Sequence, residues 1–265
     1  QLPAVRGQYT YNAPLKHLTT FGIGGAAEVL FTPADIADLA TFWQHRPTQI
    51  PITLLGEGSN VLIRDGGIPG LTVHLGKGCD VVTITDKTLY CEAGASTGKV
   101  ARAARNAGLA GAAFLCGIPG SMGGALVMNA GCYGDELCQK LIAVDVIDEK
   151  GQRRRMPPAF FNFTYRHSVL PENWIFAAAH LALEPAQKED IRAHMQEINQ
   201  KRRNSQPLSW PNAGSWFKNP PGLKAWQLID EAGCRGLSCG DAQVSQKHSN
   251  FFINTGQATA AQMES

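Results

Sequence analysis

Apolar and polar residues follow two different periods along this chain of 265 residues. Short apolar runs, each bounded by Gly or Asp, recur before residue 150 and predict β-strands. These runs are Ile52–Leu55, Val61–Ile63, Leu71–Leu75, Val81–Ile84, Thr88–Cys91 and Leu141–Ile147. Two later strands are predicted over Trp174–Leu183 and Asn250–Asn254. The first half of the chain is therefore expected to be rich in strands.

Helical spacing of apolar residues predicts four helices among these strands. They extend from a Thr32 cap through Trp43, with Pro33 in the first position, from a Ser96 cap to Gly108, over Gln187–Asn204 and over Lys224–Ala232. In the third helix, Ile191, Met195 and Ile198 share one face. The mixture of strands and helices indicates an α+β fold without regular strand–helix–strand units. The strand-rich part of the chain ends near residue 185, where we place a domain boundary.

Charge and composition exclude several classes of protein and partner. The chain is 44% apolar and 17% charged with a net charge of +2, which excludes a disordered chain or a polycation. Residues 150–218 contain 11 basic and 5 acidic residues, a net +6 that suits an anionic small molecule or a solvated surface. For Arg153–Arg155 we favour a solvated hairpin strand after the turn at Asp148–Gly151. The charge excess is too small for a nucleic-acid partner.

The seven cysteines are scattered and form no Cys-x-x-Cys pair, so we expect reduced, mostly buried thiols in a cytoplasmic protein. No segment approaches the ~18 consecutive apolar residues of a membrane span, and the first residues do not resemble a targeting signal. We expect a monomer without membrane or metal partners, and we expect native residues to be missing at either end of this sequence.

Glycine is in excess, and 21 of the 28 glycines lie in residues 1–134. One cluster, Gly56–Asn60, directly follows a predicted strand, so its backbone N–H groups can face a phosphate. Taken alone, a Gly-rich turn between strands is more often an ordinary hairpin turn, which we favour for this cluster by itself. The segment Cys116–Gly134 contains six glycines and almost no charge. It fits either a flat ligand, which we favour because of its length and because it holds Ser121 and Asn129, or a tightly packed Ala/Gly-rich helix.

Two segments of the second half carry candidate chemistry. Arg166 lies between aromatic and hydroxyl residues in Phe163–Ser168, where it can stabilise developing negative charge or be a surface arginine. Ser215 follows a glycine in Pro211–Pro221, with Lys218 three residues later. The segment is no Gly-x-Ser-x-Gly elbow, so the Ser215 hydroxyl is a candidate proton donor or a capping group in a turn.

Six segments, in order along the chain, closely resemble the UDP-N-acetylenolpyruvoylglucosamine reductase family of flavin enzymes. They are Thr19–Gly25, Gly56–Leu62, Gly117–Gly124, Asn129–Gly134, Tyr165–Ser168 and Asn212–Pro220. The resemblance extends from about Leu15 to the end of the chain and includes Gln243–Phe251. It implies an α+β fold of the vanillyl-alcohol-oxidase (PCMH) type. Residues 1–185 would form the FAD-binding domain, as two subdomains that divide near residue 75, and residues 186–265 a substrate domain truncated at its C-terminus.

The resemblance also implies site residues. Those expected to bind FAD are Gly56, Gly58, Ser59, Asn60, Gly117, Ile118, Pro119, Gly120, Ser121, Gly123, Gly124, Asn129 and Gly131. Those expected to bind the UDP-linked amino sugar are Tyr165, Lys218, Asn219 and His248. Ser215 would protonate the carbanion formed on the substrate, and Arg166 would stabilise its negative charge.

The implied reaction has two halves at one site, in which NADPH reduces FAD and the enolpyruvyl nucleotide is then reduced to UDP-N-acetylmuramate for peptidoglycan. The family's second catalytic acid is a Glu after a C-terminal helix, and this sequence ends at Ser265 before such a position. The short segment between Arg166 and Trp174 resembles the subtype without a long Tyr-bearing loop. A sugar or lactone oxidase of the same fold and a flavin-binding module without catalysis stay as alternatives.

Overall fold

A computed structural model describes residues 2–265 and separates into two compact units. Unit 1 contains residues up to Tyr9 together with residues 31–56 and 73–199. Unit 2 contains residues 10–30, 57–72 and 200–265, so the chain passes between the units several times. The sequence analysis expects residues 1–185 to bind FAD and residues 186–265 to bind the substrate. The two compact units do not show which residues bind which ligand, so this division stays a prediction.

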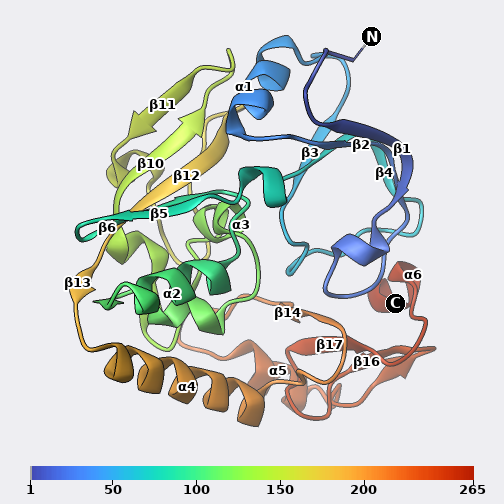
Figure 1. The fold of residues 1–265 in the computed structure, drawn as a ribbon. Helices are drawn as coiled ribbons and strands as arrows, with labels where there is room; N and C mark the ends of the chain where they lie inside the picture. The colour runs from blue at the N-terminus through green and yellow to red at the C-terminus, as the bar shows by residue number, and fades with distance from the viewer. Residues whose placement is uncertain (1) are drawn as a thin grey trace. The chain divides into compact units, whose positions relative to one another are not determined.

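Unit 1 is built on a five-stranded antiparallel sheet. Its order is β11 (Arg153–Met156), β10 (Leu141–Ile147), β12 (Ile175–Ala182), β6 (Thr88–Glu92) and β5 (Val82–Thr85). Figure 1 shows α2 (Thr97–Asn106) and α3 (Met122–Val127) beside this sheet, and both helices contact its strands. The sheet and its helices agree with the α+β class expected from sequence, and β10 has the predicted bounds.

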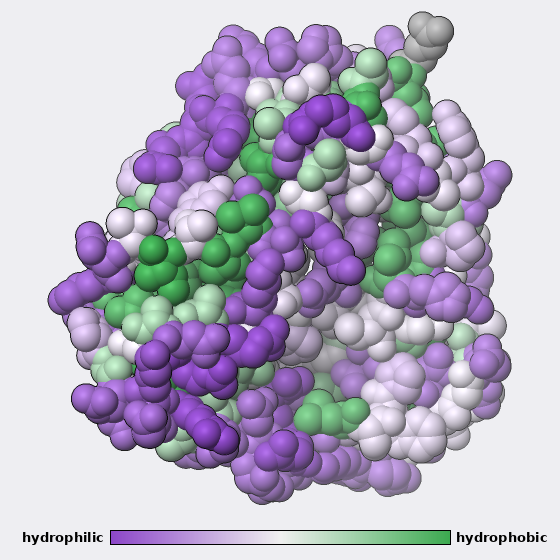
Figure 2. All heavy atoms as spheres, viewed as in Figure 1, coloured by the Kyte–Doolittle hydropathy of each residue, from purple (hydrophilic) through white to green (hydrophobic). Residues whose placement is uncertain are grey.

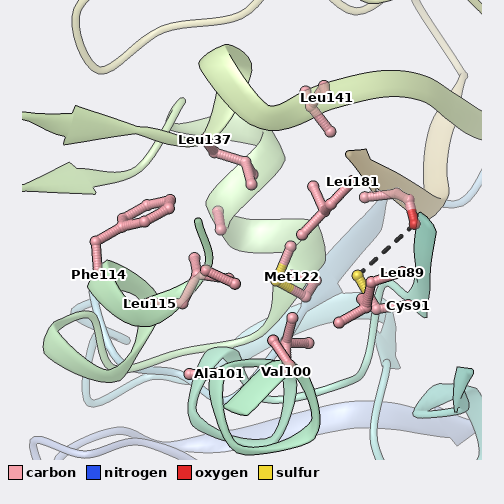
Figure 3. Packing of buried hydrophobic residues seen from close by; sticks show 14 of the residues in the cluster. Leu89, Cys91, Val100, Ala101, Phe114, Leu115, Met122, Leu137, Leu141 and Leu181 are labelled. Atoms are coloured by element: carbon pink, nitrogen blue, oxygen red, sulfur yellow. Dashed lines mark hydrogen bonds between the residues drawn. The ribbon is translucent and has the colours of Figure 1, made fainter. Parts of the chain in front are cut away.

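The main core lies where the sheet meets its helices. Figure 3 shows Val100 of α2, Met122 of α3 and Leu181 of β12 pointing toward one another. Helix α4 (Lys188–Ser205) completes the core with Ile191, Met195 and Ile198. These are the three apolar residues that the helical spacing predicted to share one face. The 3.6-residue period therefore identified the buried face of α4 correctly.

The cysteines are all free, as expected, but they are less buried than expected. Only Cys79 and Cys91 are buried, four are partly exposed and Cys239 is exposed. Burial raises the pKa of both Cys79 and Cys91 to about 12, so these two thiols stay protonated at neutral pH. They are therefore poor nucleophiles.

The first predicted helix begins later than the sequence indicated. Helix α1 is Ile36–His45, and its cap is Asp35, whose side chain accepts from Asp38 N at 2.8 Å, so the Thr32 cap was wrong. The buried Asp38 carboxylate accepts from Ala34 N at 3.0 Å and from two N–H groups of residues 6 and 7. These bonds hold the residues before Ile36 in a turn, which moves the start of the helix.

Some strands of a second sheet run from one unit into the other. Its order is β1 (Gln8–Pro14), β2 (Ala26–Thr32), β4 (Ile68–His74) and β3 (Ile52–Leu55). The strand expected over Val61–Ile63 is absent from the described chain. Gly67 N donates to Arg64 O at 2.9 Å in a turn directly after these residues, which leaves no length for strand pairing.

Unit 2 contains a four-stranded sheet with a small core. The sheet order is β14 (Asn212–Ser215), β17 (Phe251–Asn254), β16 (Ala242–Val244) and β15 (Ser238–Cys239). Helix α5 is Ala225–Glu231 and helix α6 is Ala260–Glu264. The core includes Phe21, Ala213 and Met263, and Trp216 packs against it. Ser215 therefore lies at the end of a strand that is anchored in a hydrophobic core.

The remaining elements are short. They are β7 (Leu109–Ala110) paired with β13 (Glu184–Pro185), β8 (Gly131–Cys132) paired with β9 (Asp135–Glu136), and the 3-10 helices η1 (Lys16–Leu18), η2 (Lys77–Cys79), η3 (Ala113–Gly117), η4 (Leu137–Lys140) and η5 (Pro158–Phe161). Hydrophilic side chains cover most of the face drawn in Figure 2, and the hydrophobic ones form separate areas. Within residues 2–265, no helix has both the length and the apolar character needed to span a membrane.

We expect Ser96→Ala to lower the stability of unit 1 by about 1 kcal/mol. Ser96 is the cap of α2, and its Oγ accepts from Lys99 N at 3.2 Å, as the sequence predicted. Thermal unfolding followed by circular dichroism measures the change. Ser96→Asp retains a capping oxygen and serves as the control, and equal melting temperatures for all three proteins would contradict the prediction.

Candidate active site

Arg166 lies on a tight turn of unit 1. Thr164 N donates to His167 O at 3.0 Å and His167 N donates back at 3.2 Å, so the turn contains only Tyr165 and Arg166 between its pairing residues. Arg166 has a φ of 54°, which is uncommon for a residue with a side chain. The exposed Tyr165 ring lies 4.8 Å from the Arg166 guanidinium carbon. The turn thus presents an aromatic and a cationic side chain together.

Three acceptors hold the Arg166 guanidinium. Nη2 donates to Gly131 O at 2.7 Å, and Nη1 donates to Asn129 O and Glu136 Oε1, both at 3.4 Å. The Arg166 side chain is 27% exposed. Its Nε–H and one Nη2 hydrogen have no acceptor within residues 2–265. They are available to an anionic ligand, because a guanidinium binds carboxylates and phosphates in this way.

Asn129 connects the glycine-rich segment to this turn. Its fully buried amide Nδ2 donates to Glu136 Oε2 and to Thr164 O, each at 3.1 Å, and its Oδ1 accepts from Cys138 N at 3.0 Å. Asn129 has a φ of 38°, which asparagine tolerates better than most residues. These partners are all protein groups, so the expected contact between Asn129 and flavin stays a prediction.

Several glycines of the segment 117–131 are required by packing. A Cβ on Gly117 would lie 2.7 Å from Ile198 Cγ2 and 2.9 Å from Cys132 Sγ. A Cβ on Gly123 would lie 3.1 Å from Ala93 Cβ, and one on Gly131 would overlap Asp135 O. Tight packing, the alternative to a flat ligand, therefore accounts for these three positions.

The other residues of the segment 117–131 differ in their surroundings. The Thr97 hydroxyl shares its one hydrogen between Ile118 O and, at 3.2 Å, Gly120 O. Pro119 is exposed. The buried Ser121 caps α3 by accepting from Gly124 N at 3.4 Å. The backbone around residues 118–124 is therefore fixed in place.

The two predicted cofactor segments meet at Gly56. A Cβ on Gly56 would overlap Ser121 Oγ, so the first residue of the turn lies directly against the start of α3. Gly124 is exposed, and a Cβ there would have only Ser121 Oγ within reach, at 3.7 Å. Small side chains thus leave the backbone uncovered at this place in unit 1.

The rest of the turn belongs to unit 2. Gly58 has a φ of 59°, and a Cβ on it would overlap Leu18 O. Ser59 is partly exposed. Asn60 Nδ2 donates to Ala213 O at 2.6 Å and to Ser215 O at 3.5 Å. The structure therefore joins a predicted cofactor residue to the strand that carries the predicted proton donor.

Ser215 lines a pocket of about 160 Å³ in unit 2. The other lining residues are Asn60, Val61, Leu62, Ala213 and Trp216. Ser215 is exposed, and its hydroxyl has no hydrogen-bond partner within residues 2–265. Its backbone is fixed by pairing with Phe251 in β17. The buried Trp216 Nε1 also has no acceptor among these residues, which is unusual for a buried donor and fits a ligand oxygen. The alternative of a capping serine is not observed.

The three other predicted substrate residues have different surroundings. Lys218 is exposed, and Asn219 Oδ1 accepts from Ala225 N at 3.0 Å, so Asn219 stabilises the start of α5. His248 Nδ1 accepts from Asn250 N at 3.3 Å. Burial, and secondarily the nearby Arg235 charge, lower the pKa of His248, which keeps its ring neutral at pH 7.

The sequence did not identify Glu136, which contacts both Arg166 and Asn129. Its only local signal is a capping box with Gln139, in which Glu136 N donates to Gln139 Oε1 at 3.2 Å. That signal marks the start of η4 and does not point to Arg166. No three His, Cys, Asp or Glu side chains in residues 2–265 are grouped as metal ligands.

Comparisons with known proteins match both parts of this chain. The family model for the C-terminal domain of UDP-N-acetylenolpyruvoylglucosamine reductase matches residues 206–265, and the FAD binding domain model matches residues 27–156. The chain is 49% identical over 263 residues to the UDP-N-acetylenolpyruvoylglucosamine reductase of Azorhizobium caulinodans, covering 99% of this chain and 85% of that protein.

Solved structures extend the comparison. The crystal structure of UDP-N-acetylenolpyruvylglucosamine reductase (MurB) from Thermus caldophilus matches with a TM-score of 0.84 and 37% identity, covering 98% of this chain and 92% of that one. A glucose oxidase variant of Phl p 4 matches at a TM-score of 0.51 and 17% identity over 68% of this chain and 42% of that one, which shows a shared fold only. This chain belongs to the UDP-N-acetylenolpyruvoylglucosamine reductase family and is an FAD-dependent oxidoreductase.

Proposed function

We propose that this protein reduces UDP-N-acetylenolpyruvoylglucosamine to UDP-N-acetylmuramate with electrons from NADPH, in the cytoplasm and as a monomer. The observation that carries the proposal is the unpartnered Ser215 hydroxyl in a pocket of unit 2. Ser215 lies within residues 206–265, the part that matches the family's C-terminal domain. A sugar oxidase of the same fold gives no account of this residue.

The residues of unit 1 fit a bound FAD. The exposed Gly124 leaves backbone uncovered near the Ser121 hydroxyl, and a Cβ on Gly134, in the turn between β8 and β9, would meet no atom within 4 Å. Exposed backbone of this kind can approach a flat ring or a phosphate, which side chains would obstruct. Bound FAD would supply hydride for the substrate's vinyl group.

The chain's own residues then complete the reduction. Hydride addition to the terminal vinyl carbon leaves negative charge on the carbon beside the carboxylate. The Ser215 hydroxyl would donate a proton to that carbon. The free Arg166 N–H groups would stabilise the charge while it develops, and three protein acceptors already hold the guanidinium in place.

The function is tested by following both halves of the reaction. Purified protein should absorb as a flavoprotein, and NADPH without oxygen should bleach the flavin. Adding the enolpyruvyl nucleotide should restore the flavin absorbance and yield a product heavier by two hydrogens in mass spectrometry. Reoxidation by oxygen together with oxidation of a sugar would contradict the proposal, as would a protein that FAD cannot reconstitute.

We expect Gly124→Ala to reduce FAD binding by about tenfold or more while leaving the fold intact. Alanine is favourable inside a helix, and the new Cβ would have ordinary contacts with the protein, so only a bound group would be displaced. The measurements are the FAD dissociation constant and the melting temperature of the FAD-free protein. Gly98→Ala, in α2, is the matched helical control. Unchanged FAD affinity would remove Gly124 from the cofactor site.

A further inference from the structure

Glu136 contacts Arg166, the charged side chain of unit 1 that takes part in the proposed mechanism. Its Oε1 accepts from Arg166 Nη1 at 3.4 Å, and its Oε2 accepts from Asn129 Nδ2 at 3.1 Å. Both carboxylate oxygens thus have separate donors. The Glu136 side chain is 30% exposed, so solvent screens this ion pair only in part.

The hydrogen bonds around Glu136 form a closed ring. Arg166 donates to Glu136, Glu136 also accepts from Asn129, and the second hydrogen of Asn129 Nδ2 goes to Thr164 O in the turn that carries Arg166. The Asn129 backbone oxygen accepts from Arg166 as well. Asn129 is thus bonded both to the turn that carries Arg166 and to the Arg166 guanidinium, and Glu136 is bonded to the guanidinium and to Asn129. The Arg166 side chain therefore has little freedom to reorient.

We propose that Glu136 is a positioning residue for the reduction, because it orients the Arg166 guanidinium toward the developing negative charge. This inference rests on the proposed function. Only a carboxylate fits the position, because two donors converge on it. A glutamine would present its own NH₂ donors to either Arg166 or Asn129, and one of the two bonds would be lost.

The test is Glu136→Gln in the FAD-loaded protein. We expect flavin reduction by NADPH to be unchanged and the reduction of the enolpyruvyl nucleotide to slow by about 10- to 100-fold, since small displacements of a catalytic group have effects of this size. Glu136→Asp should recover part of the rate. The control for damage to η4 is Gln139→Ala. This variant removes the side chain that accepts from Glu136 N but removes no bond to Arg166.

A second background separates positioning from general structural damage. Glu136→Gln should have almost no further effect on the rate in an Arg166→Met protein, because the group it orients is absent. An equal rate loss in both backgrounds would overturn the proposal. A wild-type rate in the single variant would overturn it as well.

A measurement that needs no catalytic turnover tests this inference separately from the proposed function. NMR of the protein labelled with ¹⁵N-arginine reports rotation of the Arg166 guanidinium, and the Arg166→Met variant assigns the signal. Loss of the charge-assisted bond should make this rotation faster by about tenfold or more in Glu136→Gln. Unchanged rotation would refute the role of Glu136. Absence of turnover in the wild type would refute the proposed function instead.

Discussion

Ser215→Ala is expected to lower the rate of enolpyruvyl nucleotide reduction by about 10²–10⁴-fold, the usual contribution of a positioned proton donor. The variant should still bind FAD and be reduced by NADPH at the wild-type rate, because hydride transfer from NADPH requires no proton from this residue. Its backbone bonds to Phe251 and Asn60 involve main-chain atoms, so the fold of β14 should be retained.

Stopped-flow absorbance of the flavin measures the two half-reactions separately. Ser209→Ala, at an exposed serine in the turn before β14, is the matched control and should behave as the wild type. If Ser215→Ala reduces the nucleotide at the normal rate, another group or water donates the proton. If both half-reactions fail together, the variant has lost its cofactor or its fold.

Arg166→Met should lower the same half-reaction by about 10²–10³-fold, as when a donor to a developing oxyanion is removed. Methionine lacks the guanidinium and leaves Gly131 O and Glu136 Oε1 without the donor that Arg166 supplies. Substrate affinity should change less than the rate, because the stabilised charge appears only during the reaction.

Arg166→Lys tests whether charge alone is enough. A lysine keeps the charge but cannot reproduce the planar set of donors, which binds three protein acceptors and retains two further N–H groups. We therefore expect it to remain slow. Recovery to the wild-type rate would show that a point charge is sufficient and would contradict the role assigned to the guanidinium geometry.

Local sequence signals predicted the helices α1, α2, α4 and α5 and several strands, but not β1, β2, α3 or α6. Two of their errors have the same kind of cause. The Ser96 cap and the buried face of α4 follow from residues within one or two helical turns, and the structure agrees with both. The start of α1 and the absent strand at Val61–Ile63 depend on Asp38 and on the turn at Arg64, which act through bonds that periodicity does not register.

The sequence by itself determined the family, the α+β class and the identity of Ser215 and Arg166 as candidates, because these are properties of residue type, order and spacing. Only the tertiary structure placed Glu136 and Asn129 around Arg166 and joined Asn60 to the strand of Ser215. The bond from Asn60 to Ala213 O spans 153 positions. Contacts at such separations form only when the chain folds, so no local pattern of hydrophobic and polar residues can encode them.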